Sequence, residues 1–282
     1  MFARMQTLPL LTDRLALDRN RARALRAPAL FLHDEVASEV QERLIEVNRT
    51  FTAPAVVTPF ADLWRKLMPS AHIVADTDVL DLAVGAHDLV IHALALHWSN
   101  DPVGQLVQCR RALKPDGLFI GLLFGGQTLS QLRTSLAEAE VSLTGGLSPR
   151  VLPMGEIRDL GGLLQRAGFA LPVADSFTRT ARYRDAYHLM ADLRAMGEGN
   201  ALQHRQRLPA KRSLFALAAQ NYGAAFGDID GLIPATFDII CLTGWAPDDS
   251  QQKPLRPGSA SHRLADMLGA DEKTLPRGLG DG

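Results

Sequence analysis

Apolar residues follow two different patterns along this chain: helical spacing in some stretches and short continuous runs in others. Between residues 30 and 47 they fall at the three- and four-residue intervals of an amphipathic helix, with carboxylates and arginines between them. Residues 55–60, 71–76 and 87–98 are instead short and almost continuously apolar, which is typical of strands covered on both faces. The pattern predicts a helix that precedes a parallel sheet.

The stretch from residue 99 to 124 is the clearest unit of this sheet. Asp101 can cap a helix whose first turn holds Pro102, and Gly117 releases the chain into a strand at 118–124. The pattern predicts further helices near 128–143, 154–167, 184–196 and 211–226, and further strands at 171–183 and 234–247. Strands and helices in this order predict a doubly wound α/β fold with an antiparallel pair at one edge.

The chain divides into three parts by composition. Residues 1–50 are expected to form a helical segment that begins with a turn and a charged helix. Residues 51–250 are expected to form the α/β domain, with helical lid insertions at about 127–168 and 184–226. Residues 251–282 are rich in proline, glycine and serine, which predicts a loosely ordered tail.

Net charge, the length of the apolar runs and the spacing of the histidines exclude several classes of protein. The chain has 30 basic and 31 acidic residues, so its net charge of −1 creates no overall field that would attract nucleic acid. Its apolar runs are no longer than a strand, which predicts no transmembrane segment. The eight histidines are scattered without ligand spacing, so no metal site is expected.

Two features bear on the cellular compartment. Cys109 and Cys241 have neither metal spacing nor a disulfide framework, which fits a reducing cytoplasm. The arginine-rich start has some features of a transit peptide, but Asp13 and Asp18 argue against one. We therefore expect a cytoplasmic location.

Longer stretches are more specific than the periodicity. HDLVIHALALHWSNDPVGQLVQCRRALKPDGLFIGLLFGGQTLSQLR, from residue 87, resembles the region of strands four and five in class I S-adenosylmethionine-dependent methyltransferases. Within that superfamily it is most similar to the malonyl-carrier-protein methyltransferase of biotin synthesis and to the mitochondrial complex I assembly factor 5 type. The resemblance to the assembly factor continues through DLRAMGEGN and IPATFDIICLTGWAPDDSQQKPLRPGSA, and it covers residues 28 to 260 approximately.

This resemblance implies a Rossmann-like domain with a seven-stranded sheet that ends in an antiparallel pair. It also implies S-adenosylmethionine across the carboxyl ends of the first strands. In the family, a glycine-rich turn after the first strand, a carboxylate after the second and an aspartate after the third hold this cofactor. Only one helix fits between Phe60 and Ala71, so one βα segment of the family fold is expected to be missing.

The expected cofactor positions carry unusual residues. The resemblance places Thr58, Phe60, Asp76, Thr77 and Leu94 at the cofactor. Asp76 falls either on the adenine-binding position after the third strand or on the ribose-binding position after the second, and a carboxylate that merely caps a turn is the alternative. Pro59 locks φ and has no N–H, and Phe60 adds bulk where the family has glycine, so we expect cofactor affinity to be absent or much weakened.

Candidate chemistry clusters after the fourth strand of the family fold. His97 could act as a base and Trp98 could form a pocket wall; the alternative is that both close the top of an apolar layer with satisfied hydrogen bonds. Strand alternation predicts that His92 and Leu94 share one face and that His97 lies on the opposite one, unless the strand ends before Leu96. The resemblance places further substrate or pocket residues at His92, Asn100, Gly126, Met196, Glu198 and Asn200. The basic stretch 204–212 is expected to be a solvated loop, with docking of an acidic partner as the alternative.

Two functions follow from the resemblance. The first is an S-adenosylmethionine-dependent enzyme that modifies a protein or carrier-protein substrate, by hydroxylation of an arginine on a complex I subunit in the assembly-factor branch. The second is a pseudoenzyme that has lost the cofactor and binds or chaperones a partner such as a respiratory-complex subunit.

Overall fold

The computed structural model describes residues 10–251, and their helices and strands lie in the unit Met1–Asp248. One mixed sheet has the strand order β2-β1-β3-β4-β6-β5. Its strands are β1 (Pro54–Val57), β2 (His72–Val74), β3 (His87–Ala93), β4 (Leu113–Gly125), β5 (Ala170–Tyr183) and β6 (Ile233–Trp245). The first four are parallel, β6 is antiparallel to β4, and β5 is antiparallel to β6. The predicted Rossmann-like α/β fold with an antiparallel edge pair is confirmed.

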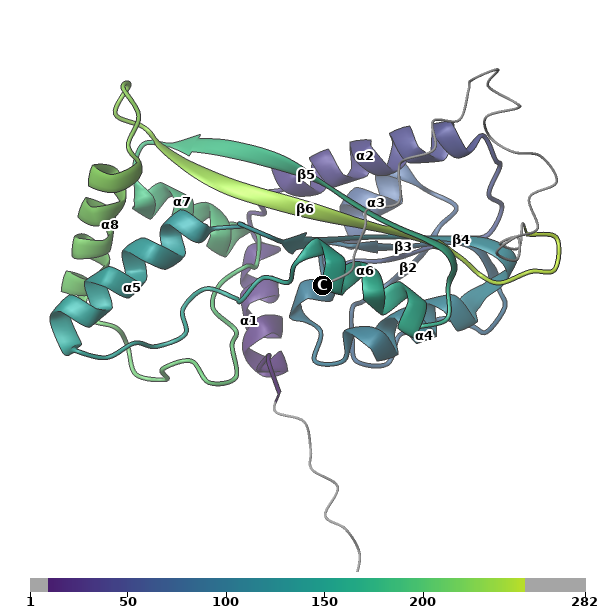
Figure 1. Cartoon of the computed structure of the whole chain (residues 1–282), viewed down its shortest axis with the longest axis horizontal. Helices are drawn as coiled ribbons and strands as arrows, with labels where there is room; N and C mark the ends of the chain where they lie inside the picture. The colour runs from purple at the N-terminus through teal and green to yellow at the C-terminus, as the bar shows by residue number, and fades with distance from the viewer. Residues whose placement is uncertain (1–9, 252–282) are drawn as a thin grey trace, which may run out of the picture. The chain divides into compact units, whose positions relative to one another are not determined.

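Helices cover both faces of the sheet (Figure 1). Two pack on each face: on one α2 (Phe31–Val47) and α3 (Ala61–Leu67), on the other α4 (Pro102–Ala112) and α6 (Ile157–Arg166). Alternate residues of β4 join the two core clusters, Leu118, Ile120 and Leu122 the first, Phe119 and Leu123 the second. Burial on both faces explains why the strands are almost continuously apolar.

Three further helices gather where β5 ends and β6 begins (Figure 1). We call them the cap helices: α5 (Ser130–Thr144), α7 (Ala186–Ala195) and α8 (Arg212–Phe226). α5 and α7 each pack against α8, and apolar residues of all three join the first core cluster. The predicted helices 128–143, 184–196 and 211–226 are therefore present, each with ends within two residues of the expectation.

The N-terminal helix α1 (Arg14–Ala24) is the charged helix that the sequence predicts. Asp13 caps it by accepting a hydrogen bond from Ala16 N at 3.2 Å. Leu17, Arg21 and Ala24 lie on one face of the helix and are buried. A buried arginine requires a partner, and that partner belongs to the candidate site described below. The tail expected over 251–282 lies outside the described residues, except for its first residue.

Strand pairing decides where the short strand β2 belongs. β2 pairs in parallel with β1 and therefore lies beside the first strand, where the family has its second. The sheet of the described residues has six strands, one fewer than the resemblance implies. This arrangement agrees with the loss of one βα segment.

The apolar run 87–98 is not a strand throughout. Leu94 adopts a left-handed conformation with φ 46°, so β3 ends at Ala93, and a short 3₁₀ helix, η1 (Leu96–Trp98), follows. Leu94 joins the first core cluster, whereas His92 points toward Gln105 of α4 on the other face. The strand thus ends before Leu96, which is the stated exception to the expected alternation, and His92 and Leu94 lie on different faces.

Candidate functional site

The backbone N–H groups of the turn after β1 are already hydrogen-bonded within the chain. Thr58 N donates to Val74 O at 2.9 Å, Phe60 N donates to the Thr58 hydroxyl at 3.2 Å, and Pro59 has no N–H. Phe60 is buried, and its ring lies edge-on to the ring of His33 in α2, with centroids 4.7 Å apart. Residues 58–60 therefore have no free backbone amide for a ligand.

Asp76 follows β2 and is only 5% exposed. Its carboxylate forms an ion pair with the guanidinium of Arg21 in α1, and Arg14 of the same helix donates to Asp76 O at 2.8 Å. Thr77 is exposed, and its hydroxyl donates to Val79 O at 2.7 Å. The carboxylate expected to face a nucleoside is thus neutralised by arginines of the chain itself.

These contacts test whether the chain fits S-adenosylmethionine, the cofactor that the fold family implies. In the family, backbone amides of a glycine-rich turn and unpaired carboxylates hold that molecule. Here the amides at residues 58–60 are already used, Asp76 is ion-paired, and Leu94 is 1% exposed. The residues present do not fit that mode of binding.

His92 is completely buried at the carboxyl end of β3. Its Nε2 lies 2.9 Å from Oε1 of Gln105, whose side-chain amide donates to Thr77 O at 3.0 Å. Burial lowers the pKa of His92 to about 4, although the bond to Gln105 opposes this change. His92 is therefore neutral at pH 7 and links β3 to α4 and to the loop after β2.

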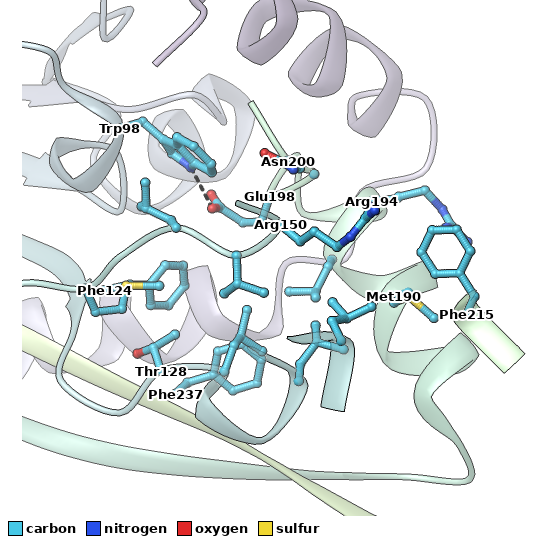
Figure 2. A pocket seen from close by; sticks show the side chains of 18 residues that line it. Trp98, Phe124, Thr128, Arg150, Met190, Arg194, Glu198, Asn200, Phe215 and Phe237 are labelled. Atoms are coloured by element: carbon cyan, nitrogen blue, oxygen red, sulfur yellow. Dashed lines mark hydrogen bonds between the residues drawn. The ribbon is translucent and has the colours of Figure 1, made fainter. Parts of the chain in front are cut away.

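His97, Trp98 and Glu198 meet although they come from distant parts of the chain. Trp98 Nε1 donates to Glu198 Oε2 at 2.7 Å, and His97 Nε2 lies 3.2 Å from the same oxygen (Figure 2 shows the Trp98 bond). Burial alone would raise the pKa of Glu198, but His97, the charge of Arg21 and the Trp98 N–H together lower it. Glu198 is therefore held as a carboxylate.

A cavity of about 210 Å³ lies beside this carboxylate, at the end of the sheet that carries the cap helices (Figure 2). Most of its wall is apolar, with aromatic rings from Trp98, Phe124 and Phe237. The few polar groups in the wall include Glu198 and Arg150, and Arg150 Nη2 pairs with Glu140 Oε1 at 2.6 Å. The charge of Arg150 is thus balanced outside the cavity.

The structure brings some of the predicted substrate residues together and separates others. Trp98, Glu198 and Asn200 line the cavity. His92 does not, and neither do Asn100, Gly126 and Met196.

Asn100, Gly126 and Met196 instead have positions that the fold itself explains. Asn100 Oδ1 accepts a bond from Thr12 N at 2.8 Å, and its amide donates to Thr12 O at 3.1 Å. Gly126 has φ 53°, and a Cβ there would lie 2.6 Å from Asp238 Oδ2, which explains the glycine at this turn. Met196 is 3% exposed at the end of α7.

Sequence reasoning missed Arg14, Arg21 and Gln105. The two arginines lie seven residues apart on one face of a helix that otherwise carries few apolar residues, and this spacing is the signal that could have found them. Nothing in the sequence marks Gln105, because its partners lie 13 and 28 residues away.

Comparisons with known proteins agree on one superfamily. A family model for a methyltransferase domain matches residues 35–121. Arginine-hydroxylase NDUFAF5, mitochondrial, of Danio rerio is 36% identical over 84% of this chain and 82% of its own length. The Homo sapiens protein of the same name is 39% identical over 75% of this chain and 61% of its own length. Malonyl-[acyl-carrier protein] O-methyltransferase of Xylella fastidiosa is 34% identical over 64% of this chain and 58% of its own length.

The fold and these relatives define the chain as a class I methyltransferase-like α/β protein. Within that class, it belongs to the family of arginine-hydroxylase NDUFAF5. The resemblance to the complex I assembly factor 5 type and to the malonyl-carrier-protein methyltransferase is confirmed.

The expected cytoplasmic location is wrong. The Danio rerio and Homo sapiens relatives are mitochondrial proteins by name. Cys109 and Cys241 are buried free thiols, and free thiols are compatible with any reducing compartment. Cysteine usage could therefore not separate the cytoplasm from another reducing compartment.

Two findings concern residues 10–251 alone. None of their helices is both long enough and apolar enough to cross a bilayer. They also contain no cluster of three or more His, Cys, Asp and Glu side chains that could hold a metal ion.

Proposed function

We propose that this chain binds an arginine side chain of a protein partner in the cavity beside Glu198, and that it does so without S-adenosylmethionine. The observation that carries the proposal is the Glu198 carboxylate in the wall of a mostly apolar, aromatic-lined cavity, whose other charged groups are Arg150, paired with Glu140, and Arg194. The resemblance to a complex I assembly factor supports a respiratory-complex subunit as the partner.

The chemistry of the cavity suits a guanidinium group. A carboxylate accepts guanidinium N–H groups in charge-assisted hydrogen bonds, and aromatic faces attract the same cation. Glu198 supplies the carboxylate, while Trp98 and Phe124 supply rings. The names of the relatives, which are arginine hydroxylases, support arginine over lysine.

The cofactor-free part of the proposal rests on the other end of the site. The backbone amides of the turn at 58–60 are engaged and Asp76 is ion-paired, so the donors and the acceptor that would hold an adenosyl ligand are already used. A ligand would have to break a buried ion pair before it could bind to Asp76.

Hydroxylation of the bound arginine is a second candidate function. His97 favours it, because its imidazole is buried next to Glu198 and its Nδ1 has no hydrogen-bond partner within the described residues. His97 is not among the residues that line the cavity, so it could act on the bound side chain only through Glu198. Hydroxylation would replace one C–H bond of the arginine with C–O–H, taking one atom of dioxygen while the other leaves as water with two electrons from an added reductant. Mass spectrometry of a peptide after incubation with the protein, oxygen and a reductant distinguishes this candidate, since hydroxylation adds one oxygen atom and binding adds none.

The binding proposal is tested with two blocked tripeptides, one with a central arginine and one with a central citrulline. We expect the arginine peptide to bind, and Glu198→Gln to weaken its binding by about tenfold or more, because a charge-assisted hydrogen bond is lost. The glutamine oxygen can still accept the Trp98 N–H, so the fold is retained.

Glu138→Gln is the matched control, because Glu138 is exposed on α5 and is not among the residues that line the cavity. It should bind the arginine peptide as the unmodified protein does. Equal affinity of the arginine and citrulline peptides, or of the Glu198→Gln variant and the unmodified protein, contradicts the proposal.

A further inference from the structure

Helix α1 contacts a loop that borders the cavity. We call residues 196–205, which follow α7, the cap loop. Asn20 Nδ2 of α1 donates to Gly199 O at 2.9 Å, and Asp13 N donates to Ala201 O at 2.8 Å. Just before the helix, Leu11 O accepts a bond from Gln203 N at 2.8 Å. The helix and the residues before it therefore hold the backbone of the cap loop at three places.

Charge adds to this attachment. Arg205 Nη2 of the cap loop lies 2.9 Å from Asp13 Oδ2, the residue that caps α1, and Arg207 Nη1 lies 3.0 Å from the same oxygen. The basic stretch 204–212 is thus partly engaged within the chain. Glu198, the carboxylate of the cavity, belongs to the same cap loop.

The other contact of α1 is with the end of the sheet. Arg21 and Arg14 bind Asp76 through its carboxylate and its backbone oxygen. Between these contacts, Leu17 is fully buried in a small cluster with Trp98, Ala201 and Leu202. One helix therefore contacts the loop after β2, the cavity wall at Trp98 and the cap loop.

Arg21 is the best placed of these residues to hold the helix. It is 7% exposed, its guanidinium pairs with a buried carboxylate, and its aliphatic part faces the end of α7, where a Cβ at Gly197 would lie 3.1 Å from Arg21 Cγ. Movement of α1 away from the sheet would break this buried ion pair, so the pair opposes undocking of the helix.

We propose that α1 is a built-in latch: the ion pair between Arg21 and Asp76 keeps the cap loop closed beside the cavity, at the position where the family places its cofactor. The chain's own helix thereby takes over the role of a bound nucleoside in ordering this end of the sheet. The inference concerns the closed state of the loop and does not depend on what the cavity binds.

Hydrogen–deuterium exchange of the full chain, without any ligand, tests this proposal. Arg21→Met removes the charge and keeps most of the side-chain volume. We expect amides of the cap loop, including that of Gln203, to exchange at least tenfold faster, while amides of β3 and β4 keep their rates. Arg19→Met is the matched control, because Arg19 is exposed on the same helix and its side chain makes no hydrogen bond or ion pair within the described residues, so all rates should stay unchanged.

A second variant keeps the test decisive if Arg21→Met does not fold. Arg21→Met with Asp76→Asn removes both charges, so no unpaired carboxylate is buried, and the sheet should fold while the cap loop still exchanges at least tenfold faster. Cap-loop rates equal to those of the unmodified protein would overturn the proposal. A uniform acceleration that includes β3 and β4 in the double variant would overturn it as well, because the pair would then stabilise the whole fold and not the loop.

Discussion

At the level of single residues, the carboxylates of Asp76 and Glu198 have different surroundings. Asp76 is in an ion pair with Arg21 and has Arg14 close by. Glu198 uses one oxygen for Trp98 and His97, and its side chain lines the cavity. A carboxylate already in an ion pair contributes to the fold, whereas one that borders a cavity can accept hydrogen bonds from a ligand. This contrast assigns ligand recognition to Glu198.

Buried neutral histidines give the protein a predictable dependence on pH. Burial lowers the pKa of both His33 and His92 to about 4, well below the value of about 6.5 in an unfolded chain. The unfolded state therefore binds more protons between pH 6.5 and 4, and the free energy of unfolding falls as the pH drops through this window. We expect a loss of about 2 kcal/mol per histidine between pH 7 and 5.

Urea unfolding at pH 7, 6 and 5 measures this loss. His33→Leu replaces one of the two rings with an apolar group of similar size, so it should reduce the pH dependence by about half. A variant with the same pH dependence as the unmodified protein would contradict this prediction, because the pKa of His33 would then be the same in the folded and unfolded states. Burial also lowers the pKa of His87, which acts in the same direction.

The sequence predicted the position of Asp76 better than its role. Its place after a short strand follows from the apolar pattern and the family resemblance. Its partner Arg21 lies 55 residues earlier, and such a pairing depends on how a helix docks, which no local pattern encodes. The same reason explains why Glu198 was expected at the site while its bond to Trp98, 100 residues away, was not.

At the level of elements, the end of α7 is fixed by Gly197. This residue has φ 78°, and a Cβ there would lie 3.1 Å from Arg21 Cγ and 3.4 Å from Arg21 Cα. Gly231 has a similar φ of 74° but no atom within 4 Å of the position of a Cβ. The two glycines thus share backbone strain and differ in the contact with α1.

Alanine substitution at these two glycines separates the energetic cost of backbone strain from the cost of disturbed packing. Gly231→Ala should cost about 1 kcal/mol of unfolding free energy through its positive φ alone. Gly197→Ala should cost about 1 kcal/mol more, because the added methyl group also displaces α1. Thermal or urea unfolding of both variants measures the difference, and equal losses would mean that α1 yields without cost.

Elements were predicted more reliably than their ends. The periodicity indicated α2, α5, α7 and α8 because each has an apolar stripe that packs into the core. It failed at the end of β3, since the run 87–98 stays apolar through Leu94 and Leu96 although the strand stops at Ala93. A continuous apolar run reports burial and not backbone conformation.

At the level of the whole molecule, closure of the cofactor end involves three separate parts: the turn after β1, the shortened sheet and helix α1. Pro59→Gly restores one amide donor and backbone freedom, but it leaves Asp76 paired with Arg21. We therefore expect calorimetric titration with S-adenosylmethionine, up to about 1 mM, to give no binding for either the unmodified protein or this variant. Micromolar binding by the unmodified protein would contradict cofactor-free function, and binding by the variant alone would assign the loss to the turn.

The long strand β5 has a consequence for association between copies. Within the described residues it pairs only with β6, so its 14 residues form a border of the sheet, and such borders can recruit another strand and start polymerisation. Arg179 and Arg182 stand on this strand and are held by Glu35 and Asp228. A second molecule approaching edge-on would meet these ion-paired side chains beside the backbone, and charged side chains on an edge strand are one way in which proteins oppose edge-to-edge association.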